Sequence, residues 1–281
     1  MNDFNYQEWV GKSETVTDVI SAWPVKALSA ALDRDDPRSK RGDPVPPGWH
    51  WLYFLDARRA GELGRDGHPR RGGFLPPVAL PRRMWAGGRI EFIQPIRIGS
   101  EAQRKSEIAS VEHKRGNSGD LVFVTVRHLI SGDDGPAVRE EHDIVYRSAA
   151  QPGDPPPKTK SAPAQAAWRI SLTADPVLLF RYSALTFNGH RIHYDIDYAR
   201  QDENYPGLVV HGPLQTTLLL ELCRKHERRP IKKLDYRALH PVFHTERFTV
   251  NGSPAGDGSS ALLWTANAAE NYAMTATAHF I

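Results

Sequence analysis

The chain has 281 residues, enough for two small domains or one large one, and its 36 basic and 33 acidic side chains give a net charge of +3. This near balance argues against a nucleic-acid partner, and no apolar run reaches the roughly 18 residues of a membrane span. The single cysteine, Cys223, excludes an intrachain disulfide, and the acidic start MNDFNYQEWV does not resemble a signal peptide. We therefore expect a cytoplasmic protein without a membrane partner.

β-Strands dominate the first half of the predicted structure. RIEFIQPIRIGS, from Arg89, precedes a polar stretch, and DLVFVTVRHLISGDDG and AVREEHDIVYRS follow from Asp120 and Ala137. β-Branched and aromatic residues between Gly, Asp and Ser turns are typical of strands. Residues 149–167, rich in Pro, Lys, Ser and Ala, then predict an extended linker. The expected units are residues 1–148, the linker 149–167, and residues 168–281.

The second half combines one helix with further strands. HGPLQTTLLLELCRKHERR, from His211, places Leu214, Leu218 and Leu222 four residues apart, with Pro213 suited to a first helical turn. Strands are predicted in DYRALHPVFHTERFTVNG and in the segment from Ser259 to the end. A single apolar helix before antiparallel strands predicts a sheet wrapped around that helix.

The two halves share a weak pattern. A proline follows an apolar strand in each, Pro95 in the first and Pro241 in the second, before Gly-marked turns lead into long β segments. This similarity favours an internal duplication.

Candidate chemical groups concentrate in residues 181–214, RYSALTFNGHRIHYDIDYARQDENYPGLVVHGPL. His193 can act as a general acid or base near neutral pH, and Asn188 can hold a water or a carbonyl. Gly212, at a helix start, offers an amide that could stabilise an enolate-like oxyanion. The alternative is that His193 and Asn188 only satisfy backbone groups in a loop. The spacing of His190 and His193 suits a metal, but no ligand set completes a site, so neither metal nor cofactor is expected.

The text TFNGHRIHYDIDYA, residues 186–199, resembles the MaoC-like hydratase/dehydratase pattern S-G-D-x-N-P-L-H-x-D-x-x-Y-A. The matching positions are His193, Asp195, Tyr198 and Ala199, and the pair His211-Gly212 matches the H-G that opens the superfamily's central helix. The form SALTFNGHRIHYD and the first-half text GGFLPPVALPRRMWAGG are similar to one branch. That branch contains type 2 3-hydroxyacyl thioester dehydratases and mesaconyl- and itaconyl-CoA hydratases. The resemblance covers nearly the whole chain.

The resemblance implies an α+β double hot-dog fold, in which two antiparallel sheets are each wrapped around a helix. It also implies a lyase that reversibly hydrates an enoyl-CoA thioester. One departure matters, because the superfamily's catalytic Asp falls on Asn188, and an amide does not transfer protons at ordinary pH. We expect His193 to carry the proton chemistry and Asn188 to orient the water or the thioester carbonyl; Asp195 could alternatively set the tautomer of His193. The first half has no such motif and is expected to complete the fold and the pocket without chemistry.

The expected substrate is a short branched dicarboxylyl-CoA such as mesaconyl- or itaconyl-CoA, because Arg83, beside Trp85, could pair with its free carboxylate. Tyr194 and His211 complete the predicted substrate-binding residues. A (3R)-hydroxyacyl thioester dehydratase of fatty-acid metabolism, an acyl-CoA thioesterase and a non-catalytic acyl-CoA binder are the alternatives. A homodimer is left open, although a duplicated hot dog already contains the pairing that single ones obtain by dimerising.

Overall fold

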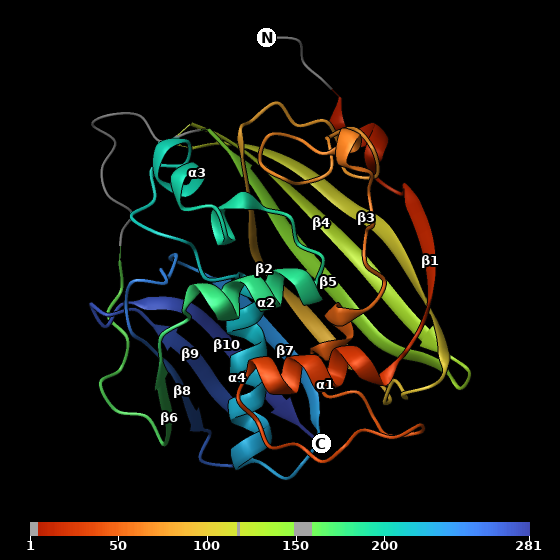
Figure 1. Ribbon diagram of the computed structural model, residues 1–281, viewed down its shortest axis with the longest axis vertical. Coiled ribbons are helices and arrows are strands. Elements are labelled where there is room, and N and C mark those ends of the chain that lie inside the picture. Colours follow the sequence, from red (N-terminus) through yellow and green to blue (C-terminus); the bar gives the residue numbers. More distant parts are fainter. Residues whose placement is uncertain (1–4, 117–118, 149–158) are drawn as a thin grey trace.

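A computed structural model describes residues 5–116, 119–148 and 159–281. Its centre is one antiparallel sheet of ten strands in the order β1-β3-β4-β5-β2-β7-β10-β9-β8-β6 (Figure 1). The first half supplies β1 Ser13–Val19, β2 Arg82–Phe92, β3 Glu101–Gly116, β4 Gly119–Gly132 and β5 Gly135–Arg147. Its helices are α1 Ala22–Ala31 and the short η1 Tyr6–Trp9, η2 Trp49–Leu52 and η3 Ala60–Glu62.

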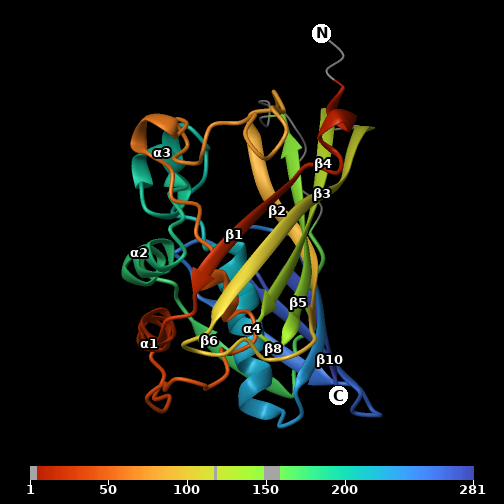
Figure 2. The ribbon, with the colours of Figure 1, turned by 90° about the vertical axis from the view of Figure 1, so that its right-hand side faces the viewer.

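The second half repeats this plan with more helix. Its strands are β6 Trp168–Leu172, β7 Ile231–Ala238, β8 Phe248–Pro254, β9 Ser260–Ala266 and β10 Tyr272–Phe280. Its helices are α2 Pro176–Leu185, η4 Arg191–His193, α3 Ile196–Gln201 and α4 Gly212–His226. Helices α1 and α2, one from each half, pack side by side (Figures 1 and 2).

The internal duplication is visible in the strand order. From the outer edge to the middle of the sheet, the first half reads β1-β3-β4-β5-β2 and the second β6-β8-β9-β10-β7. The equivalent strands β2 and β7 pair with each other, with Gly88 opposite Tyr236. Pro95 follows β2 and Pro241 follows β7, so the two prolines that suggested a repeat occupy corresponding places.

The predicted double hot-dog class is confirmed, and two details differ from the expectation. The two sheets are not separate, because the β2–β7 pairing joins them into one. Within the described residues, only the second half has a long central helix; between α1 and β2 the first half has irregular chain with η2 and η3. The polar stretch before Asp120, which was not predicted as a strand, forms β3, whose inward side chains alternate with exposed ones.

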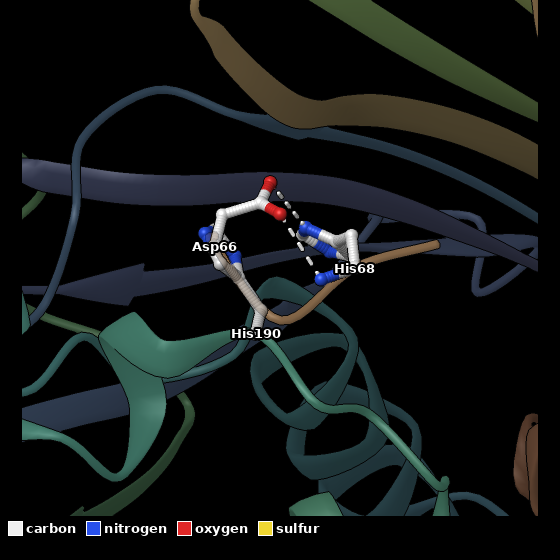
Figure 3. A group of neighbouring side chains, drawn as sticks. All are labelled: Asp66, His68 and His190. Carbon is white, nitrogen blue, oxygen red and sulfur yellow. Dashed lines mark hydrogen bonds and ion pairs between the residues drawn. The ribbon is translucent and has the colours of Figure 1, made fainter. Parts of the chain in front are cut away.

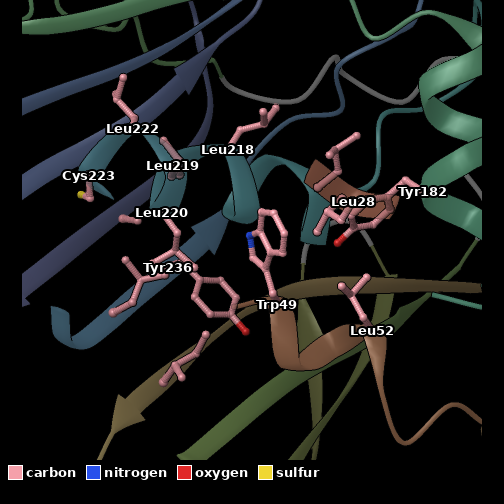
Figure 4. Packing of buried hydrophobic residues seen from close by; sticks show 14 of the residues in the cluster. Leu28, Trp49, Leu52, Tyr182, Leu218, Leu219, Leu220, Leu222, Cys223 and Tyr236 are labelled. Carbon is pink, nitrogen blue, oxygen red and sulfur yellow. The ribbon is translucent and has the colours of Figure 1, made fainter. Parts of the chain in front are cut away.

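Helix α4 lies at the centre of the core and packs against β6, β8, β9 and β10. Every side chain from Leu214 to Cys223 is buried, so the helix is enclosed on all faces rather than on one stripe. Trp49 of the first half packs among its leucines together with Tyr236 of β7 (Figure 4). The predicted helix from His211 is therefore confirmed, and its first turn is fixed at the centre of the molecule.

A buried acid on α4 connects the two halves. Glu221 accepts a hydrogen bond from Trp49 Nε1 at 2.9 Å and pairs with Arg34 at 2.6 Å and Arg224 at 2.8 Å. We expect Glu221→Ala to lower the free energy of unfolding by about 3 kcal/mol, because it leaves a buried indole N–H without its acceptor and removes one of the two carboxylates that pair with Arg34 and Arg224, the other being Asp36. Thermal unfolding measures this loss. In the matched control Glu91→Ala, which removes an exposed pair with Arg139, the loss stays below about 1 kcal/mol; equal losses would contradict the assignment.

The predicted linker is partly described. Residues 149–158 lie outside the described residues, and the rest of the segment runs beside the β9–β10 turn, where Ala162 N donates to Glu270 O and Tyr272 N to Lys160 O. The unit boundaries predicted from the sequence remain predictions. Among the described residues, no helix has the length and apolar character of a membrane span.

Candidate active site

The motif residues form part of the wall of a cavity of about 1120 Å³ between the two halves. The second half contributes Asn188, His193 and Gly212, and strand β2 of the first half contributes Arg83 and Trp85. The predicted catalytic residues are thus brought together, with two of the predicted binding residues facing the same space. A second cavity of about 770 Å³ adjoins it and shares Asn188 and Trp85 as lining residues.

His193 is held in one tautomer. Its Nδ1 lies 2.7 Å from the carbonyl oxygen of Val209, which can only accept a hydrogen bond, so Nδ1 carries the proton and Nε2 has the free lone pair. Burial lowers the pKa of His193 to about 4, which keeps the ring neutral at physiological pH. The alternative role of Asp195 is wrong, since that carboxylate pairs with Arg191 and caps α3 through Tyr198 N instead of contacting His193.

His211 lies behind His193 and lines neither cavity. The two rings stack at a centroid distance of 3.7 Å and an interplanar angle of 18°. Nε2 of His211 is 2.8 Å from Ser183 Oγ on α2, and burial lowers the pKa of the ring well below its usual range. The structure thus places this predicted binding residue as a packing support for His193.

Asn188 follows α2 and bends the chain toward η4. Its Oδ1 accepts a hydrogen bond from His190 N at 3.0 Å, and its own N–H donates to Ser183 O at 2.8 Å. The amide side chain is therefore fixed by its own loop, an arrangement typical of Asx turns. Since it lines both cavities, it is placed where an orienting group is expected.

Gly212 is the first residue of α4, where a backbone N–H has no partner within the helix. In the described ranges no other acceptor bonds to this N–H. A Cβ here would lie 2.7 Å from Cε3 of Trp85, so only glycine allows the indole to pack against the helix start. Trp85 is itself stacked on Tyr236 at 4.7 Å. An unpaired amide therefore faces the cavity beside a rigid aromatic wall.

The remaining predicted binding residues, Arg83 and Tyr194, line different cavities. Arg83 lines the larger cavity, and none of the described carboxylates forms an ion pair with it. Tyr194 lines only the smaller cavity; it is 47% exposed and donates its hydroxyl to Gly189 O at 3.0 Å. The basic residues at the end of α4 and just after it are partly neutralised: Arg224 pairs with Glu221, and Arg229 with Glu227.

Comparison with known proteins identifies the family. The model for hydroxyacyl-thioester dehydratase type 2 matches residues 48–244, which include the whole motif. The chain belongs to this family. A mesaconyl-C(4)-CoA hydratase from Chloroflexus aurantiacus is 44% identical over 257 residues, 92% of each chain. The mitochondrial hydroxyacyl-thioester dehydratase type 2 of Schizosaccharomyces pombe is 28% identical over 85% of this chain and 90% of its own.

Solved structures of low sequence identity share the fold of this dehydratase-family chain. A MaoC-like dehydratase from Phytophthora capsici superposes with a TM-score of 0.68 at 12% identity, covering 99% of this chain and 98% of the other. A Mycobacterium tuberculosis protein described as a double hotdog gives a TM-score of 0.57 at 12% identity, with 99% and 98% covered. These likenesses, together with the strand order, establish the double hot dog.

Three side chains of this family member lie together at the cavity, and the sequence did not predict that they would meet. Asp66 and His68, from the irregular segment of the first half, meet His190 beside the motif (Figure 3). His190 had been considered only for its spacing to His193, and the text GRDGHPRR around Asp66 matches no recognised motif. One sequence feature could have pointed to them. The loop Asp66-Gly67-His68 offers a carboxylate and an imidazole in a chain that has Asn188 where the superfamily has its catalytic Asp.

The ligand atoms of Asp66, His68 and His190 lie within 4.8 Å of one another, as do those of His128, Glu140 and His142. Such sets could hold a metal, which the sequence did not predict. In the first set both Asp66 oxygens already accept hydrogen bonds from His68, so a metal would have to displace one of them. In the second, Oε2 of Glu140 already accepts from Trp51 Nε1 and lies 3.0 Å from Nε2 of His50.

Proposed function

We propose that this chain catalyses the reversible hydration of an enoyl-CoA thioester, with a short branched dicarboxylyl-CoA such as mesaconyl-CoA as its substrate. The observation that carries the proposal is the shared cavity wall of His193, a neutral imidazole with its Nε2 free, and Gly212, an unpaired amide at a helix start. The relative named mesaconyl-C(4)-CoA hydratase, 44% identical over 92% of the chain, supports this substrate class.

The chemistry follows from these two groups. The thioester carbonyl binds at the Gly212 amide, where the N–H and the positive end of α4 stabilise the enolate-like state. Nε2 of His193 takes a proton from water as the water oxygen attacks C3. Asn188, fixed by its hydrogen bond to His190 N, orients that water or the carbonyl. Trp85 and Tyr236 form an apolar wall that excludes other water.

A panel of enoyl-CoAs tests the reaction class. Mesaconyl-, itaconyl-, crotonyl- and octenoyl-CoA are followed at the enoyl absorbance, and products are resolved by mass. A gain of one water with the thioester intact supports hydration. Free thiol released without hydration would indicate a thioesterase, and preference for octenoyl-CoA would indicate a (3R)-hydroxyacyl thioester dehydratase. Calorimetric binding of acyl-CoA without turnover would indicate a binder and overturn the proposal.

Arg83, which has no ion pair among the described residues, is proposed to read the free carboxylate of the substrate. We expect Arg83→Ala to lower kcat/KM for mesaconyl-CoA by about 100-fold while crotonyl-CoA, which has no carboxylate, loses less than about 3-fold, since a charge-assisted hydrogen bond contributes roughly 1.5–3 kcal/mol. Steady-state kinetics on both substrates measures the difference.

Arg104 provides the matched control for Arg83. It lines only the smaller cavity, its Nε is buried without a partner, and it is half-buried like Arg83. If Arg104→Ala instead removes the preference for mesaconyl-CoA, the carboxylate is read in the smaller cavity. An equal loss on both substrates in Arg83→Ala would show that Arg83 does not read the carboxylate.

An acyl-CoA is the proposed partner. The cytoplasmic location predicted from the sequence and a homodimer also remain proposals, and the S. pombe relative is named mitochondrial. Cell fractionation and light scattering of the purified chain test them.

A further inference from the structure

The hydration proposed above needs two proton transfers, one from water and one onto C2, but the motif offers a single proton carrier. Asn188 replaces the expected carboxylate, and its Oδ1 is occupied by His190 N at 3.0 Å. His193 has its Nε2 free for one of the two transfers. A second titratable group near the same cavity would let a different atom carry each transfer.

A carboxylate–imidazole pair meets this need. Asp66 Oδ2 lies 3.0 Å from Nδ1 of His68, and Oδ1 accepts the backbone N–H of the same histidine at 3.1 Å (Figure 3). Because the carboxylate accepts, Nδ1 of His68 carries the proton and Nε2 is free, the same tautomer as in His193. A carboxylate behind an imidazole both orients the ring and stabilises its protonated form.

The loop that carries the pair is fixed to the motif. Gly67 has a φ of +86°, and a Cβ there would lie 1.9 Å from the carbonyl oxygen of Gly189, so the two backbones touch. Arg191 N donates to Asp66 O at 2.9 Å, and the Arg191 guanidinium donates to Arg65 O at 3.1 Å. The first half is thus held against the residues that flank His190.

His68 shares the larger cavity with His193 and Gly212. The ring centroids of His68 and His190 are 4.1 Å apart, and those of His190 and His193 are 5.5 Å apart. Burial, aided by the charge of Arg83, lowers the pKa of His68 to about 4. Burial acts to raise the pKa of Asp66, but its hydrogen bonds to His68 outweigh this and lower it, so the carboxylate is charged.

We propose that His68, oriented by Asp66, is the second proton carrier of the reaction and is supplied by the first half of the chain. This rests on the proposed hydration. As the water oxygen bonds to C3, the water proton passes to Nε2 of His193, and the C2–C3 π electrons move onto the thioester. That proton crosses through water in the cavity to the free Nε2 of His68, whose positive charge Asp66 balances. From there it forms the C2–H bond, so that both imidazoles end neutral, and Asp66 acts only as a positioning residue.

Hydrogen exchange at C2 separates the two imidazoles. Saturated butyryl-CoA and methylsuccinyl-CoA in D₂O exchange C2 hydrogens, seen by NMR, without any water addition. We expect His193→Ala to lose hydration of the enoyl-CoAs but keep this exchange, and His68→Ala to lose both by roughly 10²–10⁴-fold. Added imidazole restores part of the exchange in His68→Ala. The matched control His279→Ala, at a 44%-exposed histidine of β10, keeps both activities.

Asp66→Asn tests the positioning role. Loss of the negative charge lowers the pKa of His68 further, so the pH at which exchange reaches its plateau shifts downward, and kcat falls while KM stays constant. His68→Asn, which retains a donor for Asp66, replaces His68→Ala if the alanine variant does not fold by circular dichroism. Wild-type exchange rates in a folded His68 variant overturn the proposal. If the wild-type chain hydrates no enoyl-CoA of the panel, the proposed function itself is wrong, a result distinct from normal hydration and exchange without His68.

Discussion

His193→Ala is expected to lower kcat/KM for hydration by about 10²–10⁴-fold, the contribution usual for a general acid–base group. The reason lies in the hydrogen bond of Nδ1 to Val209 O, which leaves Nε2 as the basic atom in the cavity wall. The change also leaves that buried carbonyl without its donor, at a cost of about 1–3 kcal/mol in unfolding free energy. Enoyl absorbance and thermal unfolding, measured on the same preparation, report the two effects.

His193→Asn distinguishes chemistry from structure at this position. Its side-chain amide is able to donate to Val209 O, so stability should recover, while the variant still has no group that titrates near neutral pH. Hydration should remain as low as in His193→Ala. Rapid turnover in either variant, with the His279→Ala control at the wild-type rate, would remove His193 from the mechanism.

Gly212→Ala is expected to have the second largest effect, through geometry alone. The new Cβ would lie 2.7 Å and 3.1 Å from two ring carbons of Trp85. That indole is not free to move, because it stacks on Tyr236 at 4.7 Å and meets Trp51 edge-on at 5.7 Å. The start of α4 must shift and the oxyanion donor with it. We expect kcat to fall about 10²-fold and stability by about 1–3 kcal/mol.

The double variant Gly212→Ala with Trp85→Leu tests whether the clash is the cause. Removing the indole makes room for the Cβ, so the double variant should be more active than Gly212→Ala and lie close to Trp85→Leu alone. A double-mutant cycle on kcat and on the midpoint of unfolding gives the coupling. Simple additivity would show that Gly212 acts through something other than its contact with Trp85.

The elements that the sequence predicted best are those in which apolar residues recur at one regular spacing. Leu214, Leu218 and Leu222 repeat at helical spacing and form the enclosed helix α4. In β3 the inward face includes Arg104 and Ser106 among its aliphatic residues, so the sequence of this segment is polar although the strand lies inside the sheet, between β1 and β4. The sequence also does not reveal that the described part of the first half lacks a long helix. No local pattern in residues 32–81 reveals that irregular chain covers the sheet there.

In the candidate site, too, some contacts could be predicted from the sequence and others could not. His193, Asn188 and Gly212 lie within one contiguous motif, so their proximity could be predicted from the sequence. The contact between Gly212 and Trp85, and the approach of Asp66 and His68, join residues more than a hundred positions apart. These depend on how two halves dock, which spacing along the chain does not encode. The sequence offered Asp195 only as an alternative for setting the His193 tautomer, and it gave no sign of the Val209 carbonyl that does so, because a backbone carbonyl leaves no mark in the sequence.

The β2–β7 seam has a consequence for how such a molecule can change. Two identical subunits joined at this seam would have to carry every substitution twice, at both copies of the site. With both repeats in one chain, each acquires its own substitutions. Here the second repeat has the enclosed helix and the His-Gly pair. The described part of the first repeat has irregular chain in the corresponding place, and its loop around Asp66 contacts the second repeat beside His190. The two repeats therefore differ on either side of the seam, and the proposed site takes its histidines from both.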